Sequence, residues 1–495
     1  MIGRNLLSGF ASSGFSALLG FLFVPLYIKY LGIESYGLIG FFATMQAVLA
    51  LLDMGIAPTM NREAARSLSL GKLVELGDLL RTLSLIYWAI GILVLVIIIA
   101  LAPFIAAHWL QSSSIDVERL GRTIMLMGLV FSCRWPISLY QSTLIGMQRI
   151  QIASFLTMSM ALLGNLGALI TLAYASPSIE AFFIWQVIVA ILNVAIIHWV
   201  TWSSFKEKST IRFQSLKSVW KFSAGMSGIA FSSIFLMQLD KILLSKMLPL
   251  EIFGYYSLAV VFAGSLSILI GPVFNVIYPR LSALVVEDNE KKVLEFYMVG
   301  TQMLAGIIFP VAFLAAFFSE DILYYWIKDV SIVTQVTPIA SLLFIGGAIN
   351  GVMILPYALQ LAHGMTRLPL FIVLSLIGIY GPLTYYMVLT YGAIGGALSW
   401  LILNALYLLY GPWLTHRYLL KNSGLRWFFR GVLVPASISL MTIYLGWSFF
   451  KEPNGHWQNL FLGILLASIA ILMNYSLLPT SVHQRLNLLN KVFKD

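Results

Sequence analysis

Charge is scarce in this sequence. Only 10% of the 495 residues are Asp, Glu, Lys or Arg, whereas an ordinary soluble domain has about 25%. Hydrophobic residues make up 60% of the chain, which is more than a water-soluble core needs. Apolar runs of about 18 residues or more, each long enough to cross the hydrocarbon of a bilayer, recur along the whole length. The composition therefore excludes a soluble protein and predicts an all-α polytopic membrane protein.

Cysteine and catalytic motifs are scarce too. The single Cys133 lies inside an apolar run, so disulfides play no part. The sequence has no GxxxxGK[ST] phosphate loop, no HExxH pattern and no nucleophile elbow. With 6 His, widely scattered, we expect no metal site. We therefore expect neither an enzyme nor a cofactor. Without a phosphate loop, any work that the chain performs would draw on an H⁺ or Na⁺ gradient.

Fourteen apolar segments have the length of a membrane-spanning helix. They are Leu6–Ile28, Gly37–Met60, Leu83–Ala107, Thr123–Leu144, Ile152–Tyr174, Ala181–Val200, Phe222–Leu244, Phe253–Tyr278, Tyr297–Phe318, Thr337–Leu361, Pro369–Leu389, Gly392–Leu414, Val432–Phe450 and Leu460–Leu478.

The basic residues indicate how these segments are oriented. With the N-terminus inside, 22 of the 30 Lys and Arg fall in inside segments, 6 in outside segments and two within spans. Cytoplasmic loops carry such an excess, so both termini are predicted to be cytoplasmic. The net charge of +10 is then a topology signal that contacts anionic membrane lipids, and we expect no nucleic-acid partner.

Two halves of the sequence repeat each other. KYLGIESYGL at 29–38 returns as KMLPLEIFGYY at 246–256, so that Gly37 corresponds to Gly254. GMQR at 146–149 likewise returns as GMTR at 364–367, at nearly the same offset. Each half contains six segments, an even number, so both halves cross the membrane in the same sense. The sequence thus predicts two parallel six-helix lobes, a transporter architecture with the substrate site between them.

The repeat also predicts the domain boundaries. We expect an N-terminal lobe at 1–200, a cytoplasmic linker at 201–221, a C-terminal lobe at 222–414, and two further helices with a cytoplasmic tail at 415–495. In the repeated turn, glycine permits a tight reversal and close backbone approach. A gating role for Glu34 or Glu251 at the outer mouth is the alternative for this turn.

Four charged residues lie within spans and are candidates for the substrate site: Arg134, Lys241, Asp53 and Asp240. A charge at bilayer depth costs about 3 kcal/mol, so such residues normally pair or face an aqueous cavity. Arg134 can grip a phosphate bidentately. A structural ion pair between Asp53 and Arg134 is the alternative. Adjacent residues on a helix point about 100° apart, so either Lys241 or Asp240 could face the cavity while the other pairs with a neighbour.

Amide side chains are spread through the apolar segments. Asn165, Asn350 and Asn404 are examples. We expect most of them to hold helices together across their interfaces.

The N-terminal sixth of the chain carries several motifs in order. They are NLLSG at 5–9, VPLYIKYLGIESYGL at 24–38 and LLDMGIAPTMNREAAR at 51–66. With Pro25, Leu31–Gly32, Tyr36–Gly37 and Asp53–Gly55, this part resembles the polysaccharide-type flippases of the multidrug/oligosaccharidyl-lipid/polysaccharide (MOP) exporter superfamily.

The resemblance implies a function. Such a protein moves a lipid-linked oligosaccharide on undecaprenyl diphosphate, a repeat unit of O-antigen, capsule or exopolysaccharide, across the bacterial cytoplasmic membrane. A cationic cavity would hold the diphosphate-sugar head while the polyprenyl tail stays in lipid. Arg134 and Lys241 suit that cavity. The resemblance also implies a polysaccharide polymerase and a chain-length regulator as partners.

Three other functions remain open. The last two helices resemble the extra pair of the lipid II flippases, but those proteins carry arginines in the first helix, and Leu6–Ile28 has no charge. A drug/cation antiporter of the same superfamily would use acidic groups such as Asp53 and Asp240. An accessory subunit of a polymerase or synthase complex would move no lipid-linked sugar by itself.

Overall fold

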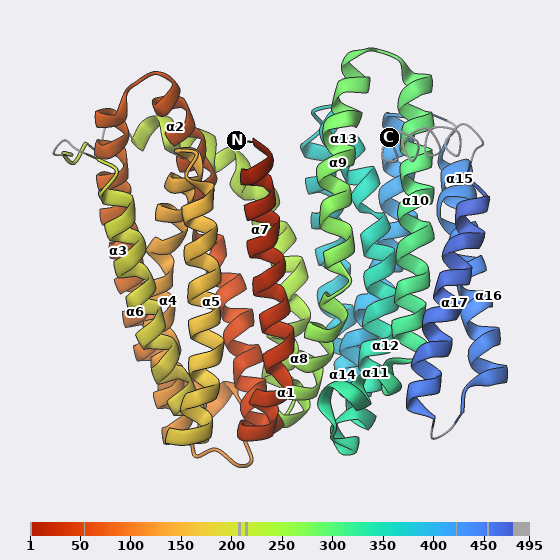
Figure 1. The fold of residues 1–495 in the computed structure, drawn as a ribbon, viewed down its shortest axis with the longest axis horizontal. Coiled ribbons are helices and arrows are strands. Elements are labelled where there is room, and N and C mark those ends of the chain that lie inside the picture. The colour runs from red at the N-terminus through yellow and green to blue at the C-terminus, as the bar shows by residue number, and fades with distance from the viewer. Residues whose placement is uncertain are drawn as a thin grey trace. The chain divides into compact units, whose positions relative to one another are not determined.

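The computed structural model describes residues 2–53, 55–205, 209–212, 216–421, 423–452 and 455–478. Within them the secondary structure is helical throughout, apart from one isolated bridge between Gln111 and Pro249 (Figure 1). Eleven helices of this part are long and apolar enough to cross a membrane. The predicted all-α multi-span membrane protein is therefore confirmed.

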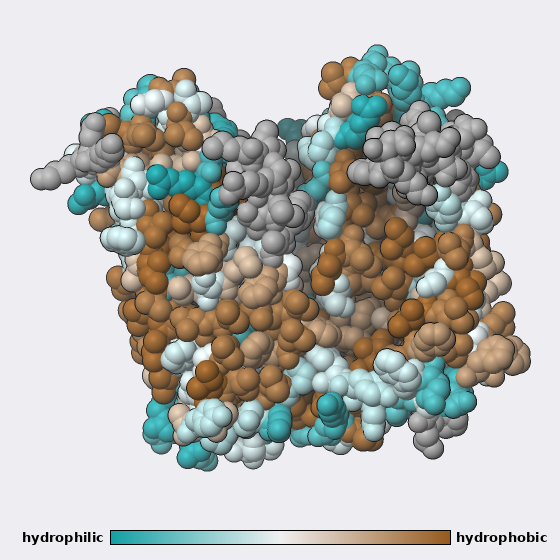
Figure 2. Space-filling view, in the orientation of Figure 1, coloured by the Kyte–Doolittle hydropathy of each residue, from teal (hydrophilic) through white to brown (hydrophobic). Residues whose placement is uncertain are grey.

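The chain forms two compact units, Met1–Gly254 and Tyr255–Asp495. In each of them, hydrophobic residues cover the middle of the surface and hydrophilic residues gather towards the two ends (Figure 2). This is the surface that a bilayer requires, because hydrocarbon solvates the middle and water solvates the ends.

The first unit is built from six long helices and several short elements. They are α1 (Ile2–Leu49), η1 (Ala50–Asp53), α2 (Ile56–Ser69), α3 (Leu73–Phe104), η2 (Ile105–Trp109), α4 (Val117–Gly146), α5 (Ile150–Ile170), η3 (Thr171–Ala175), α6 (Ile179–Trp202) and α7 (Leu216–Met247). The unit also contains the start of α8 (Leu250–Gly264). Its core includes Met60, Leu80, Tyr87, Leu139 and Tyr140, all buried.

The second unit contains the rest of α8 and the elements that follow. They are α9 (Ser267–Val286), α10 (Glu290–Phe317), α11 (Ser319–Ile327), α12 (Val330–Val352), α13 (Ile354–Ala362), α14 (Arg367–Tyr418), α15 (Gly424–Arg426), η5 (Trp427–Leu433), α16 (Val434–Phe450) and α17 (His456–Ser476). The last two long helices, α16 and α17, pack on each other and on α10 (Figure 1). Trp427 is fully buried there and donates a hydrogen bond from its indole nitrogen to the Thr301 hydroxyl at 2.9 Å.

Two of the long helices each contain two predicted segments. In α1 the backbone leaves helical geometry at Gly32, with φ 77° and ψ 166°, and in α14 it does so at Gly392, with φ 57° and ψ −133°. Glycine has no Cβ, so it adopts these positive φ values without strain. The boundaries predicted between the first and second segments, and between the eleventh and twelfth, coincide with these two glycines.

The prediction of one continuous helix over Gly37–Met60 is wrong. The chain passes from α1 through η1 and a left-handed Gly55, with φ 71°, before α2 begins at Ile56. Pro58 explains the break, because it lacks the N–H that an uninterrupted helix would use to bond four residues back. Its place in the first turn of α2 is one that proline tolerates.

The predicted helix Phe253–Tyr278 is also interrupted. It forms α8 and α9, which are separated at 265–266. Two serine hydroxyls donate to backbone carbonyls of the preceding turn at this break, Ser265 to Phe262 at 2.7 Å and Ser267 to Gly264 at 2.6 Å. Such bonds compete with the helical ladder, and apolar periodicity does not reveal them.

The repeated turns approach each other inside the first unit. A Cβ on Gly37 would clash with the backbone carbonyl of Leu250 and lie 3.2 Å from the amide nitrogen of Gly254. A Cβ on Gly254 would in turn clash with the carbonyl of Ile33. The prediction of close backbone approach at these glycines is confirmed, but the predicted tight reversal is not at them, because Gly37 and Gly254 lie within helices and the chain of α1 breaks at Gly32 instead. The Glu34 carboxylate accepts hydrogen bonds from the hydroxyls of Ser112, at 2.7 Å, Ser113 and Ser114.

Part of the predicted linker lies against α3. The backbone amide of Thr210 donates to the buried Asp78 carboxylate at 2.5 Å, and Arg212 pairs with Asp78 at 3.0 Å. A Cβ on Gly77 would clash with the hydroxyl of Ser209. Residues 209–212 are therefore fastened to the first unit. Residues 206–208 and 213–215 of the linker, and 479–495 of the predicted tail, lie outside the described residues.

Amide side chains join helices as predicted. Asn350 in α12 donates to the Asn404 side chain in α14 at 2.7 Å. The Tyr27 hydroxyl in α1 donates to the Asn165 side chain in α5 at 3.0 Å.

Candidate functional site

Arg134 lies in α4, in the interior of the first unit's helices, and its side chain is half-buried. Its guanidinium donates from Nη2 to the Gln186 side-chain oxygen on α6 at 2.9 Å, and from Nη1 to the Gln46 oxygen on α1 at 3.5 Å. Both partners are neutral amides. Three helices thus converge on one cation.

The Arg134 guanidinium lies over the ring of Phe42. Its central carbon lies 5.6 Å from the ring centroid of Phe42, a distance that allows cation–π attraction. Phe42 stacks on Phe131 at 4.7 Å and meets Phe183 edge-on at 5.2 Å. These rings hold the guanidinium in position but, being uncharged, leave its positive charge in place.

Arg134 forms no ion pair with any carboxylate in the described part of the chain. Two hydrogen bonds to neutral groups leave further N–H donors on the guanidinium. An unpaired guanidinium in an apolar bundle costs several kcal/mol unless it meets water or an anion. The arrangement can therefore bind an anionic group, and phosphate oxygens match the guanidinium fork best.

Asp53 has partners other than Arg134. It lies at the end of η1, where its carboxylate accepts a hydrogen bond from the Tyr87 hydroxyl at 2.5 Å and from the Ala57 backbone amide at 3.2 Å. The alternative of a direct Asp53–Arg134 ion pair is thus wrong. A carboxylate beside the first N–H groups of α2 also interacts favourably with the helix dipole. Asp53 stabilises the break between η1 and α2.

Lys241 and Asp240 pair with each other on α7. The Lys241 ammonium lies 3.0 Å from a carboxylate oxygen of Asp240 and also donates to the Met237 carbonyl at 2.8 Å. The Asp240 side chain is 2% exposed and the Lys241 side chain 18%. The long Lys241 side chain thus folds back onto its neighbour in the chain.

Three residues of the Arg134 site were not among the sequence candidates: Gln186, Gln46 and Phe42. Gln186 carries the clearest signal, because it is the only amide in the apolar run FFIWQVIVA. It is buried, and it also donates to the Gly164 carbonyl at 3.4 Å. A lone amide at that depth indicates a polar partner on a neighbouring helix.

The fold places the chain beside several solved structures. The helical architecture is similar to that of solved MOP-superfamily transporters. It matches the lipid II flippase MurJ in an inward closed conformation with a TM-score of 0.72 and 16% identity, covering 94% of this chain and 98% of that one. It matches an inward-facing multidrug resistance MATE family transporter with a TM-score of 0.64 and 13% identity, covering 81% and 95%.

A further match is a MOP superfamily transporter from Pyrococcus furiosus, with a TM-score of 0.57 and 12% identity, covering 84% of this chain and 95% of that one. No curated protein matches the sequence. Residues 29–326 match the family described as polysaccharide biosynthesis protein. The chain belongs to this family, and its fold is that of the solved MOP-superfamily transporters.

Proposed function

We propose that the protein is a flippase for an oligosaccharide repeat unit linked to undecaprenyl diphosphate. It moves the unit from the cytoplasmic to the outer leaflet of the bacterial cytoplasmic membrane by alternating access. The repeat unit belongs to an O-antigen, capsule or exopolysaccharide. Membership of the polysaccharide biosynthesis family supports this substrate class.

The observation that carries the proposal is the unpaired Arg134. The diphosphate-sugar head must leave water, and a cation without a carboxylate partner can replace part of its hydration. Gln186 and Gln46 hold the guanidinium while their neutral amides leave its charge available, and amides also suit sugar hydroxyls. Lys241 would assist only after giving up its contact with Asp240.

The acidic residues do not favour a cation antiporter. Asp53 is held by Tyr87 and Ala57, and Asp240 faces the Lys241 ammonium. A binding site for a cationic drug needs an acidic group that is free to exchange partners, and these two contacts oppose that. The flippase therefore remains the better proposal, and its coupling would be to an H⁺ or Na⁺ gradient if the substrate's removal does not suffice.

The proposed topology has fourteen spans, both termini in the cytoplasm, and lobes at 1–200 and 222–414. The breaks at Gly32 and Gly392 support this count, because each divides a long helix into two segments of spanning length. The duplication is supported by a shared interruption, because the second predicted helix of each half is broken, at 50–55 and at 265–266. The two breaks are separated by nearly the same number of residues as the repeated motifs. α16 and α17 are the appended pair.

Substitution of Arg134 tests the function. Arg134→Ala should abolish surface polysaccharide and cause lipid-linked repeat units to accumulate inside, while the protein still reaches the membrane. Arg134→Lys should rescue only partly, because an ammonium keeps the charge and loses the fork. Arg149→Ala is the matched control, because this arginine of the same unit is exposed and donates to Ser204 at 2.7 Å. Normal export by an Arg134→Ala strain with normal protein abundance would remove the residue from the mechanism.

A further inference from the structure

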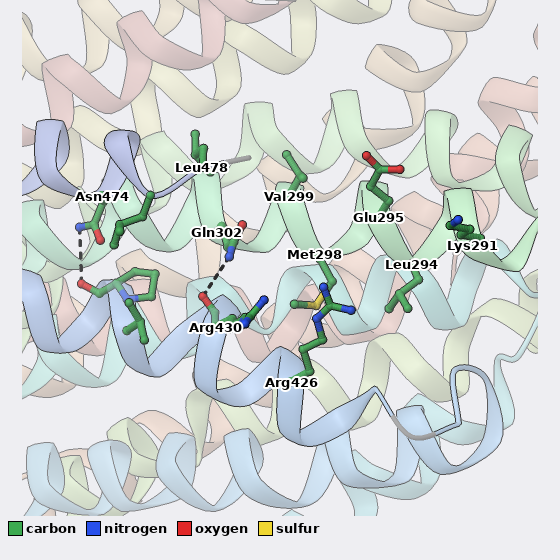
Figure 3. A pocket seen from close by; sticks show the side chains of 13 residues that line it. Lys291, Leu294, Glu295, Met298, Val299, Gln302, Arg426, Arg430, Asn474 and Leu478 are labelled. Atoms are coloured by element: carbon green, nitrogen blue, oxygen red, sulfur yellow. Dashed lines mark hydrogen bonds between the residues drawn. The ribbon is translucent and has the colours of Figure 1, made fainter. Parts of the chain in front are cut away.

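A charged cavity lies within the second unit. It has a volume of about 690 Å³ and is lined by residues of α10, α15, η5 and α16, and of α17 and the two residues after it (Figure 3). Lys291 and Glu295 come from the first turns of α10, and Arg426 and Arg430 come from the segment that leads into α16. The cavity therefore lies at the end of the unit where α10 begins and α17 finishes, which is the predicted cytoplasmic side.

The charges of this cavity are unbalanced. Three cations stand against the single carboxylate of Glu295, and the side chains of all four residues are exposed. None of the four forms an ion pair with another residue in the described ranges. The positive-inside rule accounts for basic residues near the cytoplasmic surface, but it does not require three of them to line one cavity. An anion bound there would relieve their mutual repulsion.

The rest of the lining is apolar and leads towards the lipid-facing surface. It consists of Leu294, Met298, Val299, Val434, Leu477 and Leu478, with Pro435 beside them. Val434 is 40% exposed and Leu477 is 54% exposed, so the apolar wall is open to the membrane. The two amide side chains of the lining donate hydrogen bonds within the protein, although the buried side-chain carbonyl oxygen of Asn474 has no partner among the described residues. Gln302 donates to the Arg430 carbonyl at 3.2 Å, and Asn474 donates to the Ser439 hydroxyl at 3.1 Å.

Cations beside an open apolar wall match an amphiphile with an anionic head. Basic pockets between membrane helices on the cytoplasmic side are suited to anionic lipid headgroups, and that leaflet is rich in them. The C-terminal segment 479–495 is a poorer occupant by charge, because it carries Arg485, Lys491 and Lys494 against Asp495. A soluble anion would use the cations but not the apolar wall.

We propose that this cavity binds the phosphate headgroup of an anionic glycerophospholipid from the cytoplasmic leaflet. Arg426 and Arg430 hold the phosphate oxygens, and Lys291 contributes a third positive charge. The first segment of one acyl chain follows Leu477 and Val434 into the bilayer. The site is separate from the Arg134 site and does not depend on what the protein transports.

Native mass spectrometry of the full-length protein tests the site. The probe is phosphatidylglycerol, compared with phosphatidylcholine and with inorganic phosphate. Each basic side chain near an anionic surface contributes about a fivefold change in affinity. Arg430→Ala should therefore weaken phosphatidylglycerol binding about fivefold, and the triple variant with Lys291→Ala and Arg426→Ala about a hundredfold.

Two further variants separate binding from misfolding. Glu295→Gln removes the single carboxylate and should tighten binding, which a merely destabilised protein would not do. Lys292→Ala is the matched control, because Lys292 is exposed, neighbours Lys291, and pairs with Glu287 at 3.5 Å outside the cavity lining. It should leave binding unchanged.

Several results would overturn the proposal. They are equal affinity for phosphatidylcholine, equal affinity for inorganic phosphate, and equal losses in the triple variant and in Lys292→Ala. Deletion of 479–495 provides one more comparison. If this deletion raises the affinity for phosphatidylglycerol, and if the triple variant and Lys292→Ala bind that lipid equally well, the cavity would be assigned to the C-terminal segment instead. Export of polysaccharide is not part of this test, so failure here leaves the proposed flippase function untouched.

Discussion

Asp321 is predicted to fasten the last two helices to the rest of the second unit. Its buried carboxylate on α11 lies 2.7 Å from His456 Nδ1, accepts a hydrogen bond from Asn459 at 3.0 Å, and lies 3.7 Å from the Lys451 ammonium. These three partners belong to α17 and to the segment between α16 and α17. Asp321→Ala removes this acceptor from all three, so that His456 loses its carboxylate partner while Asn459 keeps Glu452 and Lys451 keeps Glu320.

The expected cost follows from these contacts. Breaking a buried charged pair costs about 3–5 kcal/mol. For a domain of 150–250 residues, each kcal/mol lowers the melting temperature by about 2–4 °C. Asp321→Ala should therefore lower the melting temperature of the purified protein in detergent by about 10 °C.

Glu320 provides a matched control. It precedes Asp321 in the same first turn of α11, so removing either carboxylate loses a similar interaction with the helix dipole. Glu320 also pairs with Lys451, at 3.2 Å, but its side chain is 53% exposed. An exposed pair contributes about 0–1 kcal/mol, so Glu320→Ala should have little effect. Equal effects of the two variants would refute the reasoning, as would full additivity of Asp321→Ala with His456→Ala.

The remaining predictions concern topology, the repeated turn and the linker. In a Cys133→Ser background, Lys328→Cys should react with an impermeant thiol reagent in intact cells, and Lys208→Cys, at a position outside the described residues, should not; the opposite pattern would reverse the orientation. Gly37→Ala should destabilise the protein by about 1–3 kcal/mol, because its Cβ meets a backbone carbonyl that cannot rotate away; an unchanged melting temperature would contradict the close approach. Asp78→Ala should speed trypsin cleavage at the linker, and an unchanged cleavage rate would show that residues 209–212 are held by other means.

The sequence predicted the helical segments well and their interruptions poorly. Apolar length and positive charge determine where a chain crosses a membrane, so the segments and the reversals near Gly32 and Gly392 could be predicted. The break before α2 depends on a left-handed Gly55 and on Pro58, and the break after α8 depends on serine hydroxyls that bond to the backbone. A hydropathy pattern is averaged over many residues, so it does not reveal breaks that depend on such local contacts.

The candidate site was predicted in part, for a similar reason. Arg134 could be singled out because an intramembrane guanidinium is expensive. Its partners could not, since Gln186 and Gln46 reach it from helices whose rotation the sequence does not specify. Likewise, spacing alone did not indicate that Lys241 folds back onto Asp240, because side-chain rotamers decide that contact.

Lipid movement by the purified protein tests the central proposal most directly. Proteoliposomes would carry an undecaprenyl-diphosphate-linked oligosaccharide with a label that an impermeant enzyme or quencher can reach only from outside. The proposed function predicts that the inner-leaflet label becomes accessible with the native chain, and much more slowly with Arg134→Gln, which keeps a polar side chain and removes the charge. Movement no faster than in protein-free vesicles, or equally fast with both proteins, would contradict it.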